Sequence, residues 1–358
     1  MDTLEATQFP DTGKIQNSFF KERIFPFCGA ARREVMIGPE YGVDISLVSL
    51  PNGLAMAMTS DPLSLIPTLG LRESAWLSVQ LMANDMATTG FAPQYAQFTL
   101  NLPTTLEVDD FEQYWRYIHE FCARLGIAIT GGHTGRFEGL QSTVAGGGTM
   151  ITLAPGEQII TSKGARPGDI LIMTKQCALI ATSILALSFP ETVKKGCGAA
   201  VQQQAASLFY ETSAVEAGLI AGEIHRHTFA VTAMHDVTEG GVLGAIIELA
   251  HASGCGVEVN GDNIPVGHAQ QLIGKLFNID PRFCVGAGSM IITVKPEILE
   301  PLLKKFASQK IQATVIGKIT EPANGLILSE DGTQKKLQHP GADPYWNAFF
   351  QALQLGWK

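Results

Sequence analysis

The sequence has little charge, no dense cysteine pattern and no long apolar run, and each absence excludes a class of protein. Charged residues make up 16% of the 358 residues and hydrophobic residues 46%, which excludes a largely disordered chain. No uninterrupted apolar stretch reaches the length of about 18 residues that a membrane helix needs. The N-terminus, Met1 to Glu5, also lacks the basic start and apolar core of a secretion signal. We therefore expect a cytoplasmic protein with no membrane partner.

Other absences narrow the chemistry. The six cysteines are widely spaced and form no CxxC pair, as expected for reduced thiols. The net charge is −9 and the sequence contains no conspicuous run of Lys or Arg, which argues against a nucleic-acid partner. Zinc-ligand spacing, a G-x-S-x-G elbow, a Walker pattern and a kinase glycine loop are all missing. A bound nucleotide would therefore have to be held in another way.

The length and the alternation of predicted strands and helices indicate two domains of the α/β or α+β class. At about 150 residues per domain, a chain of this size suggests two. We predict an N-terminal arm over 1–34, a first domain over 35–160, a second domain over 161–330 and a tail over 331–358. The boundary between the domains is placed at the Pro and Gly turns between 155 and 168.

Hydrophobic periodicity and turn residues place the individual elements. Two extended segments lie within 35–59, on either side of a turn at 51–53. The remaining predicted strands are 95–102, 127–130, 142–153, 170–174 and 229–234, and the predicted helices are 71–89, 109–126, 177–188, 199–226 and 242–253.

The segment before the last of these helices combines an acid, a hydroxyl and paired glycines. Thr238, Gly240 and Gly241 stand where the helix begins, and a helix N-terminus offers free N–H groups and about half a unit of positive charge to a phosphate. Alternatively, Thr238 is only the N-cap and the glycines make a tight turn. Asp236 and Glu239 would repel a bare polyphosphate, and a Mg²⁺ ion between carboxylate and phosphate would resolve that conflict.

Three further acids stand among apolar or small residues at the ends of predicted elements: Asp44, Asp61 and Asp85. Each could be a turn former or a cap. However, an acid in such surroundings usually has a partner or a metal ion. This applies most to Asp85, whose neighbours on the predicted helix imply a largely buried position.

A second phosphate cradle is predicted at Gly131, Gly132, His133 and Thr134, which offer backbone donors and one hydroxyl. His133 and His235 each allow two interpretations. Either imidazole could be a hydrogen-bonded turn residue, or a general acid or phosphate donor, given an ordinary pKa of about 6.5.

Taken in this order, the motifs resemble the PurM-like superfamily, which includes aminoimidazole ribonucleotide synthetase, thiamine-monophosphate kinase, selenophosphate synthetase and the hydrogenase-maturation protein HypE. The resemblance covers roughly residues 35–320. The matching segments are Gly42–Asp44, Thr59–Pro62, Asn84–Ala87 with Gly90, Gly131–Thr134, Pro167–Asp169 and Asp236–Gly241.

This resemblance implies an N-terminal α/β domain whose sheet pairs with that of a second subunit into a barrel, and an adjacent C-terminal α+β domain. It implies a homodimer that binds ATP between the domains and phosphorylates an oxygen or selenium nucleophile, or converts an amide-type oxygen into a leaving group. The implied Mg²⁺ ligands are Asp44, Asp61, Asp85 and Asp236. The residues implied to lie near the nucleotide are Asn84, Gly131, Gly132, His133, Thr134, Thr238, Gly240 and Gly241.

The organisation is closest to HypE, but the sequence departs from each subfamily. HypE proteins end in a cysteine, whereas this sequence ends Gly356–Lys358 and has Glu239 where HypE usually has a basic residue. Thiamine-monophosphate kinases have an acid where His133 stands, and Cys28 lacks the loop of selenophosphate synthetases. The acceptor and the catalytic residues are therefore unassigned. The alternatives are a thiamine-type kinase and a non-catalytic nucleotide-binding accessory or regulatory protein.

Overall fold

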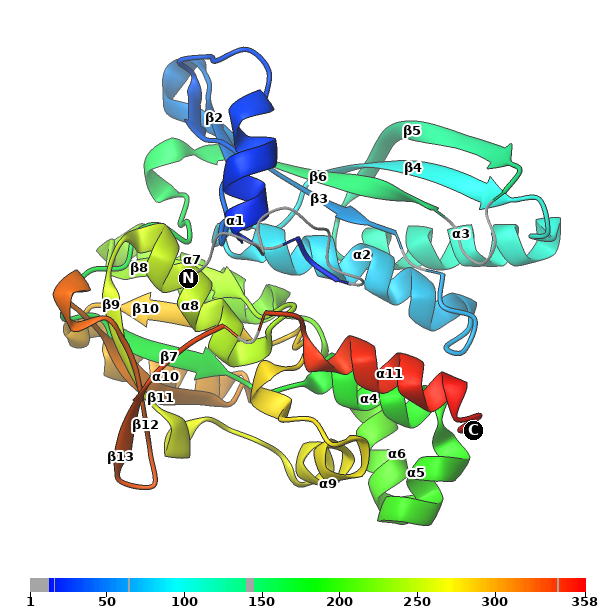
Figure 1. The fold of residues 1–358 in the computed structure, drawn as a ribbon. Helices are drawn as coiled ribbons and strands as arrows, with labels where there is room; N and C mark the ends of the chain where they lie inside the picture. The colour runs from blue at the N-terminus through cyan, green and yellow to red at the C-terminus, as the bar shows by residue number, and fades with distance from the viewer. Residues whose placement is uncertain (1–12, 16, 64, 140–144, 340) are drawn as a thin grey trace.

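The computed structural model describes residues 13–15, 17–63, 65–139, 145–339 and 341–358. The first domain is built on a six-stranded sheet in which only β4 and β5 run parallel. Two helices, α2 and α3, lie against one face of this sheet (Figure 1). In spatial order the strands are β1 (Val35–Ile37), β2 (Ser46–Ser49), β3 (Leu54–Pro62), β6 (Ala145–Pro155), β4 (Tyr95–Pro103) and β5 (Ala128–Phe137). The helices are α2 (Leu71–Ala87) and α3 (Val108–Arg124).

The second domain is built on a seven-stranded mixed sheet with helices on both faces. Its spatial order is β13 (Thr333–Lys336), β12 (Leu326–Glu330), β9 (Gly256–Asn260), β11 (Ala313–Thr320), β7 (Ile170–Thr174), β10 (Met290–Val294) and β8 (Val231–Asp236). The helices are α4 (Leu179–Ser188), α5 (Pro190–Cys197), α6 (Ala199–Ser207), α7 (Val215–Thr228), α8 (Gly241–Ser253), α9 (His268–Phe277) and α10 (Leu299–Ser308).

Strand alternation in the second domain divides the interior into two cores. In β7, Leu171 and Met173 enter a core with α4, α8 and α9, whereas Ile172 faces the opposite core, which contains α2, α7 and α10. This division follows from the two-residue period of a strand. Because α2 packs between the first sheet and the second domain, it is buried almost all round and carries buried polar residues that join the two domains.

The chain ends fold back onto the second domain. The arm contains the short helix α1 (Asn17–Phe19) and two further helical turns, and the tail ends in α11 (Pro344–Gln354). Phe349 of α11 packs against Phe189 beside α4, with ring centroids 5.4 Å apart. Figure 1 shows α11 alongside α4. Within the described residues, every helix is too short or too polar to cross a membrane.

Most predicted elements are confirmed to within a few residues, and three predictions are wrong. The helix predicted over 199–226 is two helices, because the chain between α6 and α7 turns to place its carbonyl groups against α2 and Lys175. The Gly131–Thr134 segment is part of strand β5 and makes no turn. Asp61 stands within β3 and Asp236 is the last residue of β8, since both strands run further than predicted. The start of the strand predicted over 142–153 lies outside the described residues.

Candidate metal centre

The four predicted aspartates converge from both domains. Asp44 precedes β2, Asp61 is on β3, Asp85 is in the last turn of α2, and Asp236 ends β8. Carboxylate oxygens of Asp44 and Asp236 and a ring nitrogen of His235 all lie within 4.8 Å of one another. The other two acids are near enough for their charges to act: burial raises the pKa of Asp85 well above its usual value, and the charges of Asp236, Asp61 and Asp44 raise it further.

Asp236 is the member of this group that most needs a cation. It is 1% exposed, and its Oδ2 atom is buried with no hydrogen-bond partner in the described part of the chain. Burial and the charge of Asp44 raise the pKa of Asp236 to about 8. Several buried carboxylates with an unpartnered oxygen suit a hard divalent cation, which takes oxygen ligands and removes their mutual repulsion. The donor set therefore fits Mg²⁺.

His235 links Asp44 to a second buried acid that sequence reasoning missed. His235 Nδ1 lies 2.5 Å from Asp44 Oδ1, and His235 Nε2 lies 3.2 Å from Glu248 Oε2. Burial by itself would lower the pKa of His235, but the two carboxylates raise it to about 10. The imidazole is therefore a buried cation between two acids, which neither sequence interpretation anticipated. Glu248 lies in the middle of α8, where its apolar neighbours gave the only sequence signal.

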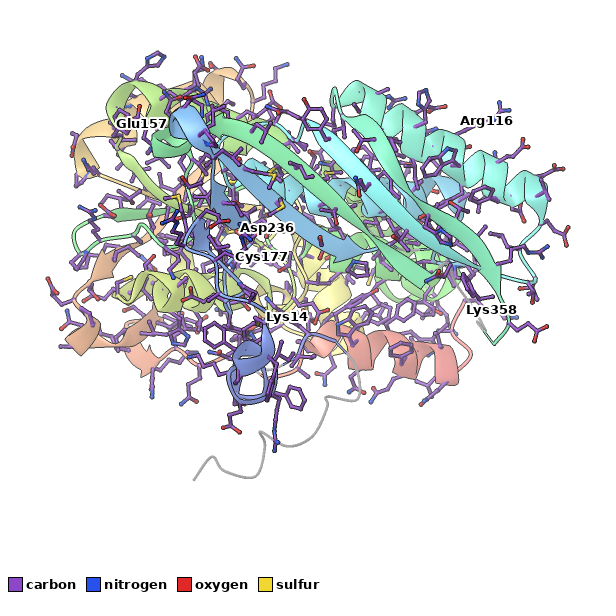
Figure 2. All side chains as sticks on the ribbon, turned by 90° about the horizontal axis from the view of Figure 1, so that it is seen from above. Lys14, Arg116, Glu157, Cys177, Asp236 and Lys358 are labelled. Carbon is purple, nitrogen blue, oxygen red and sulfur yellow. The ribbon has the colours of Figure 1, made fainter. Side chains whose placement is uncertain are left out.

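The N-terminal arm adds an ammonium group at the same place. Lys14 Nζ lies 3.0 Å from both carboxylate oxygens of Glu248, and the Lys14 backbone N–H donates to Glu239 Oε2 at 2.7 Å. Burial works to lower the pKa of Lys14, but the charge of Glu248 outweighs it, helped by Asp44 and Asp236. Figure 2 labels Lys14 and Asp236. Nothing in the sequence distinguishes this lysine from the others, so its position is a finding of the structure alone.

The helix N-terminus predicted to bind phosphate is covered by the tail of the same chain. Gly240, the N-cap of α8, donates its N–H to Asp343 Oδ2 at 2.8 Å, and the other Asp343 oxygen accepts from the Tyr345 N–H at 2.9 Å. The N-cap of α8 is Gly240, so the interpretation of Thr238 as the N-cap is wrong. A carboxylate therefore occupies the position that was expected for a phosphate.

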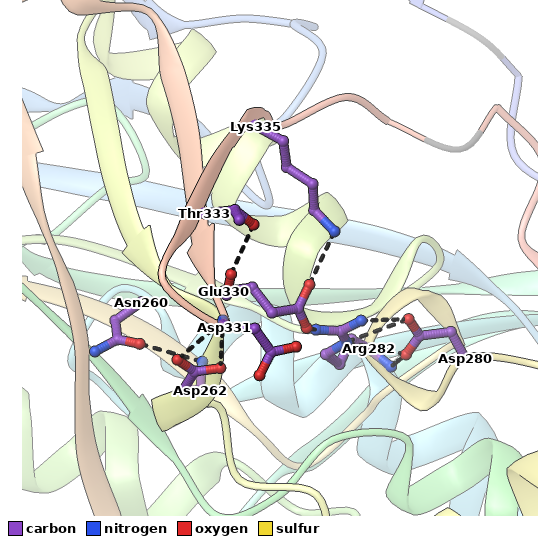
Figure 3. Close-up of polar contacts among 8 residues, drawn as sticks. All are labelled: Asn260, Asp262, Asp280, Arg282, Glu330, Asp331, Thr333 and Lys335. Atoms are coloured by element: carbon purple, nitrogen blue, oxygen red, sulfur yellow. Dashed lines mark hydrogen bonds and ion pairs between the residues drawn. The ribbon is translucent and has the colours of Figure 1, made fainter.

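Gly241 is required by packing. A Cβ on this residue would lie 2.5 Å from the carbonyl oxygen of Arg282, and its φ of +64° is in the left-handed region. Ionic contacts fix the Arg282 segment: its guanidinium meets Asp280 at 2.7 Å and also contacts Glu330, which in turn binds Lys335 (Figure 3). The glycine pair thus allows α8 to begin directly against this segment.

The predicted glycine cradle lies at the edge of the first sheet. Gly132 pairs with Phe98, Phe98 with Gly148, and Gly148 with Asp61. Gly132 and Asp61 are therefore three strand spacings apart, which amounts to about 14 Å. Gly131, Gly132, His133 and Thr134 are all exposed there. The fold therefore does not bring them into the carboxylate cluster of their own chain.

Asn84 joins the two domains beside Asp85. It is fully buried, its Nδ2 donates to the Thr212 carbonyl at 2.9 Å, and its Oδ1 accepts from the Ala214 N–H at 2.7 Å. The ammonium of Lys175 donates to two carbonyl groups of the same loop. Both polar ends of Asn84 are thus engaged by the protein, and its position fixes the last turn of α2 against the second domain.

Comparison with known proteins gives two family matches. The sequence model described as "AIR synthase related protein, N-terminal domain" matches residues 42–154, and that for the C-terminal domain matches residues 166–328. Among curated proteins, the chain is 26% identical to selenide, water dikinase of Methanococcus maripaludis, over 80% of this chain and 87% of that protein. It is also 26% identical to carbamoyl dehydratase HypE of Escherichia coli, over 73% of this chain and 75% of that protein.

Solved structures share the fold. HypE in complex with ATP superposes with a TM-score of 0.64 at 18% identity, covering 91% of this chain and 92% of that one. The HypE–HypF complex gives a TM-score of 0.69 at 18% identity, covering 90% and 99%. These similarities confirm the predicted two-domain PurM-like fold, and at such identities they establish the fold alone.

Proposed function

Because this chain belongs to the AIR synthase related protein family, we propose that it is an ATP-dependent enzyme that uses Mg²⁺ to transfer a phosphoryl group to an oxygen atom of an acceptor. The observation that carries the proposal is the convergence of Asp44, Asp61, Asp85 and Asp236 from two domains, where one buried oxygen of Asp236 has no hydrogen-bond partner among the described residues. Family relatives include a dikinase and a dehydratase, and ATP is bound in one solved HypE structure.

In this proposal the four aspartates hold the ion, which when bound neutralises charge on the phosphates. The residues of the chain do the rest by position and charge. An open groove of about 380 Å³, lined by Ser60, Asp61, Thr99 and Gly146–Thr149, leads to Asp61 and offers an approach for a polyphosphate. The ammonium of Lys14 adds positive charge close to the cluster. Positioning and charge neutralisation are the main means by which proteins accelerate phosphoryl transfer.

The acceptor belongs to a small molecule or to a side chain of a partner protein. The relatives named above differ in their acceptors, so their names do not select one for this chain. A second candidate function is a nucleotide-binding accessory or regulatory protein without turnover. The specific observation in its favour is that Asp343 and Lys14, two groups of the chain itself, occupy the α8 N-terminus and the flank of the carboxylate cluster.

We further propose that a second copy of the chain covers the outer face of the first sheet. This face exposes large apolar side chains on neighbouring strands, among them Leu54 at 42%, Leu153 at 37% and Tyr95 at 40% exposure. Val35 and Met36 of β1, at the edge of the same sheet, are exposed as well. A contiguous apolar patch of this kind is typical of an interaction surface.

Two measurements test the function. Isothermal titration of the full chain with ATP, with and without Mg²⁺, should show binding that depends on Mg²⁺. Incubation with ATP, Mg²⁺ and an acceptor panel that includes selenide, thiamine monophosphate and a metabolite extract should release ADP or AMP and phosphate.

Stimulation of this release by thiamine monophosphate would favour the thiamine-type kinase. Binding without release across the whole panel would favour the regulatory protein, and absence of binding would contradict both.

A further inference from the structure

Four alternating charges form a chain from the N-terminal arm to the carboxylate cluster. Lys14 Nζ meets Glu248 at 3.0 Å, Glu248 meets His235 Nε2 at 3.2 Å, and His235 Nδ1 meets Asp44 at 2.5 Å. Three of the four side chains are almost inaccessible to solvent, at 2% for Glu248, 3% for His235 and 5% for Asp44, whereas Lys14 is 45% exposed. They come from α8, β8, the segment before β2 and the arm.

The backbone is shaped to make this chain of charges possible. Gly42 has a φ of +77°, and a Cβ at this position would lie 2.8 Å from the carbonyl oxygen of Glu248 and 2.9 Å from its Cβ. The segment that carries Asp44 is therefore pressed directly onto α8 at Glu248. Only glycine combines the left-handed conformation with such a close approach.

Glu248 reaches the cluster only through its neighbours. Its Oε2 accepts from both Lys14 and His235, and its Oε1 accepts from Lys14. Asp44, in contrast, is held at both oxygens, by His235 at Oδ1 and by the Ser162 hydroxyl at Oδ2, 3.2 Å away. An ion pair and a hydrogen bond at its two oxygens set the orientation of a carboxylate ligand before the ion arrives.

The same glutamate also determines where the arm's ammonium rests. The charges of Asp44 and Asp236 act on Lys14 in addition to that of Glu248. Without the negative charge on Glu248, the charges of Asp44 and Asp236 still attract this ammonium toward the aspartate cluster. There it would compete with a divalent cation, because the two positive charges repel each other.

We propose that Glu248 is a positioning residue of the metal centre that acts in two ways: through His235 it orients Asp44, and by binding Lys14 it keeps the arm's ammonium away from the aspartates. This inference rests on the proposed function, since it assumes that the aspartates bind a divalent cation. It couples the docking of the N-terminal arm to the affinity for the metal.

The test is Mn²⁺ binding to the full chain without nucleotide, measured by electron paramagnetic resonance. Mn²⁺ accepts the same oxygen ligands as Mg²⁺. Glu248→Gln should weaken binding by about tenfold, the lower end of the cost of losing an outer-shell partner of a metal ligand, because Glu248 acts on Asp44 through His235. The matched control is Glu223→Gln on α7, a helical glutamate 52% exposed and paired with Lys305 at 3.4 Å, which should leave Mn²⁺ affinity unchanged.

A second substitution separates positioning from general damage. Lys14→Met should tighten Mn²⁺ binding several-fold in the wild-type background. In the Glu248→Gln background it should restore part of the lost affinity, because the freed ammonium is then absent. A merely structural role for Glu248 predicts no such rescue. Since the Lys14 side chain is 45% exposed, Lys14→Met should fold even if Glu248→Gln does not, and circular dichroism checks the fold of each variant.

The outcomes distinguish failure of the proposed metal site from failure of the proposed role of Glu248. Wild-type protein that fails to bind Mn²⁺ overturns the proposed metal site itself. If the wild-type protein binds Mn²⁺ and Glu248→Gln changes its Mn²⁺ affinity by less than about twofold, only the positioning role is overturned. Loss of affinity in Glu248→Gln that Lys14→Met does not relieve overturns the coupling to the arm, as does an unchanged affinity in Lys14→Met alone.

Discussion

Replacing Asp85 by asparagine should stabilise the metal-free protein and weaken Mg²⁺ binding at the same time. Asp85 lies in the last turn of α2, where the helix dipole presents negative charge to it. Burial and three neighbouring acids raise its pKa further. Among the described residues the Thr59 hydroxyl donates to Asp85 Oδ2 at 2.6 Å, and it can donate equally to the oxygen of an asparagine. The substitution therefore removes an unfavourable charge and keeps the hydrogen bond.

The sign of the stability change depends on pH. The pKa of Asp85 is higher in the folded than in the unfolded state. Below about pH 4 its carboxyl group is protonated in both states, so it does not lower the stability of the folded protein there. Stability is lost as the pH rises from there through the folded pKa. Removing the charge from the negative end of the helix dipole contributes about 0.3–1 kcal/mol to the stability gain. Each unit by which folding raises the pKa of Asp85 contributes about 1.4 kcal/mol. We therefore expect Asp85→Asn to stabilise the metal-free protein at pH 8 by at least the dipole contribution of about 0.3–1 kcal/mol, and to change its stability very little at pH 4.

Urea denaturation at the two pH values in the presence of EDTA measures the gain, and isothermal titration at pH 8 measures Mg²⁺ affinity. Loss of one carboxylate ligand should weaken Mg²⁺ binding by at least about tenfold, or about 1.4 kcal/mol. The control is Asp109→Asn, an exposed acid in the first turn of α3, where removal of charge should slightly destabilise the helix and leave Mg²⁺ binding alone. A destabilised Asp85→Asn variant with unchanged Mg²⁺ affinity would refute the reasoning.

Three further predictions follow from the site and the fold. Since the pKa of Asp236 is about 8 and Mg²⁺ requires the ionised carboxylate, Mg²⁺ affinity should rise by up to about tenfold per pH unit from 6 to 8 and then level off, with proton release seen as a buffer-dependent heat of binding. Gly42→Ala should lower the free energy of unfolding in urea by about 1–3 kcal/mol, because its left-handed φ and the Glu248 carbonyl oppose a Cβ. Leu153→Asp should convert a dimer into a monomer in light scattering, since it puts a charge on the apolar sheet face.

The parts of the site that sequence reasoning found are those with a local signature. An acid at the end of an apolar element, such as Asp44 or Asp236, stands out from its immediate neighbours, and each of the four aspartates was found in this way. Helix α8 was also predicted nearly to its ends, because its apolar run and the flanking glycines are local. Extended glycine-rich sequence misled the prediction at Gly131–Thr134, since a sheet edge tolerates glycines as well as a turn does.

The sequence by itself therefore determined the order of most strands and helices and the two-domain class, and it singled out the four aspartates as candidates, because each of these signals lies in neighbouring residues. Only the tertiary structure decided which groups meet them. Lys14 and Glu248 are separated by 234 positions, and Gly240 and Asp343 by 103, so no local pattern could pair the arm with α8 or place a tail carboxylate at its N-terminus. Those contacts depend on how the arm and the tail fold back onto α8, which only the tertiary structure fixes.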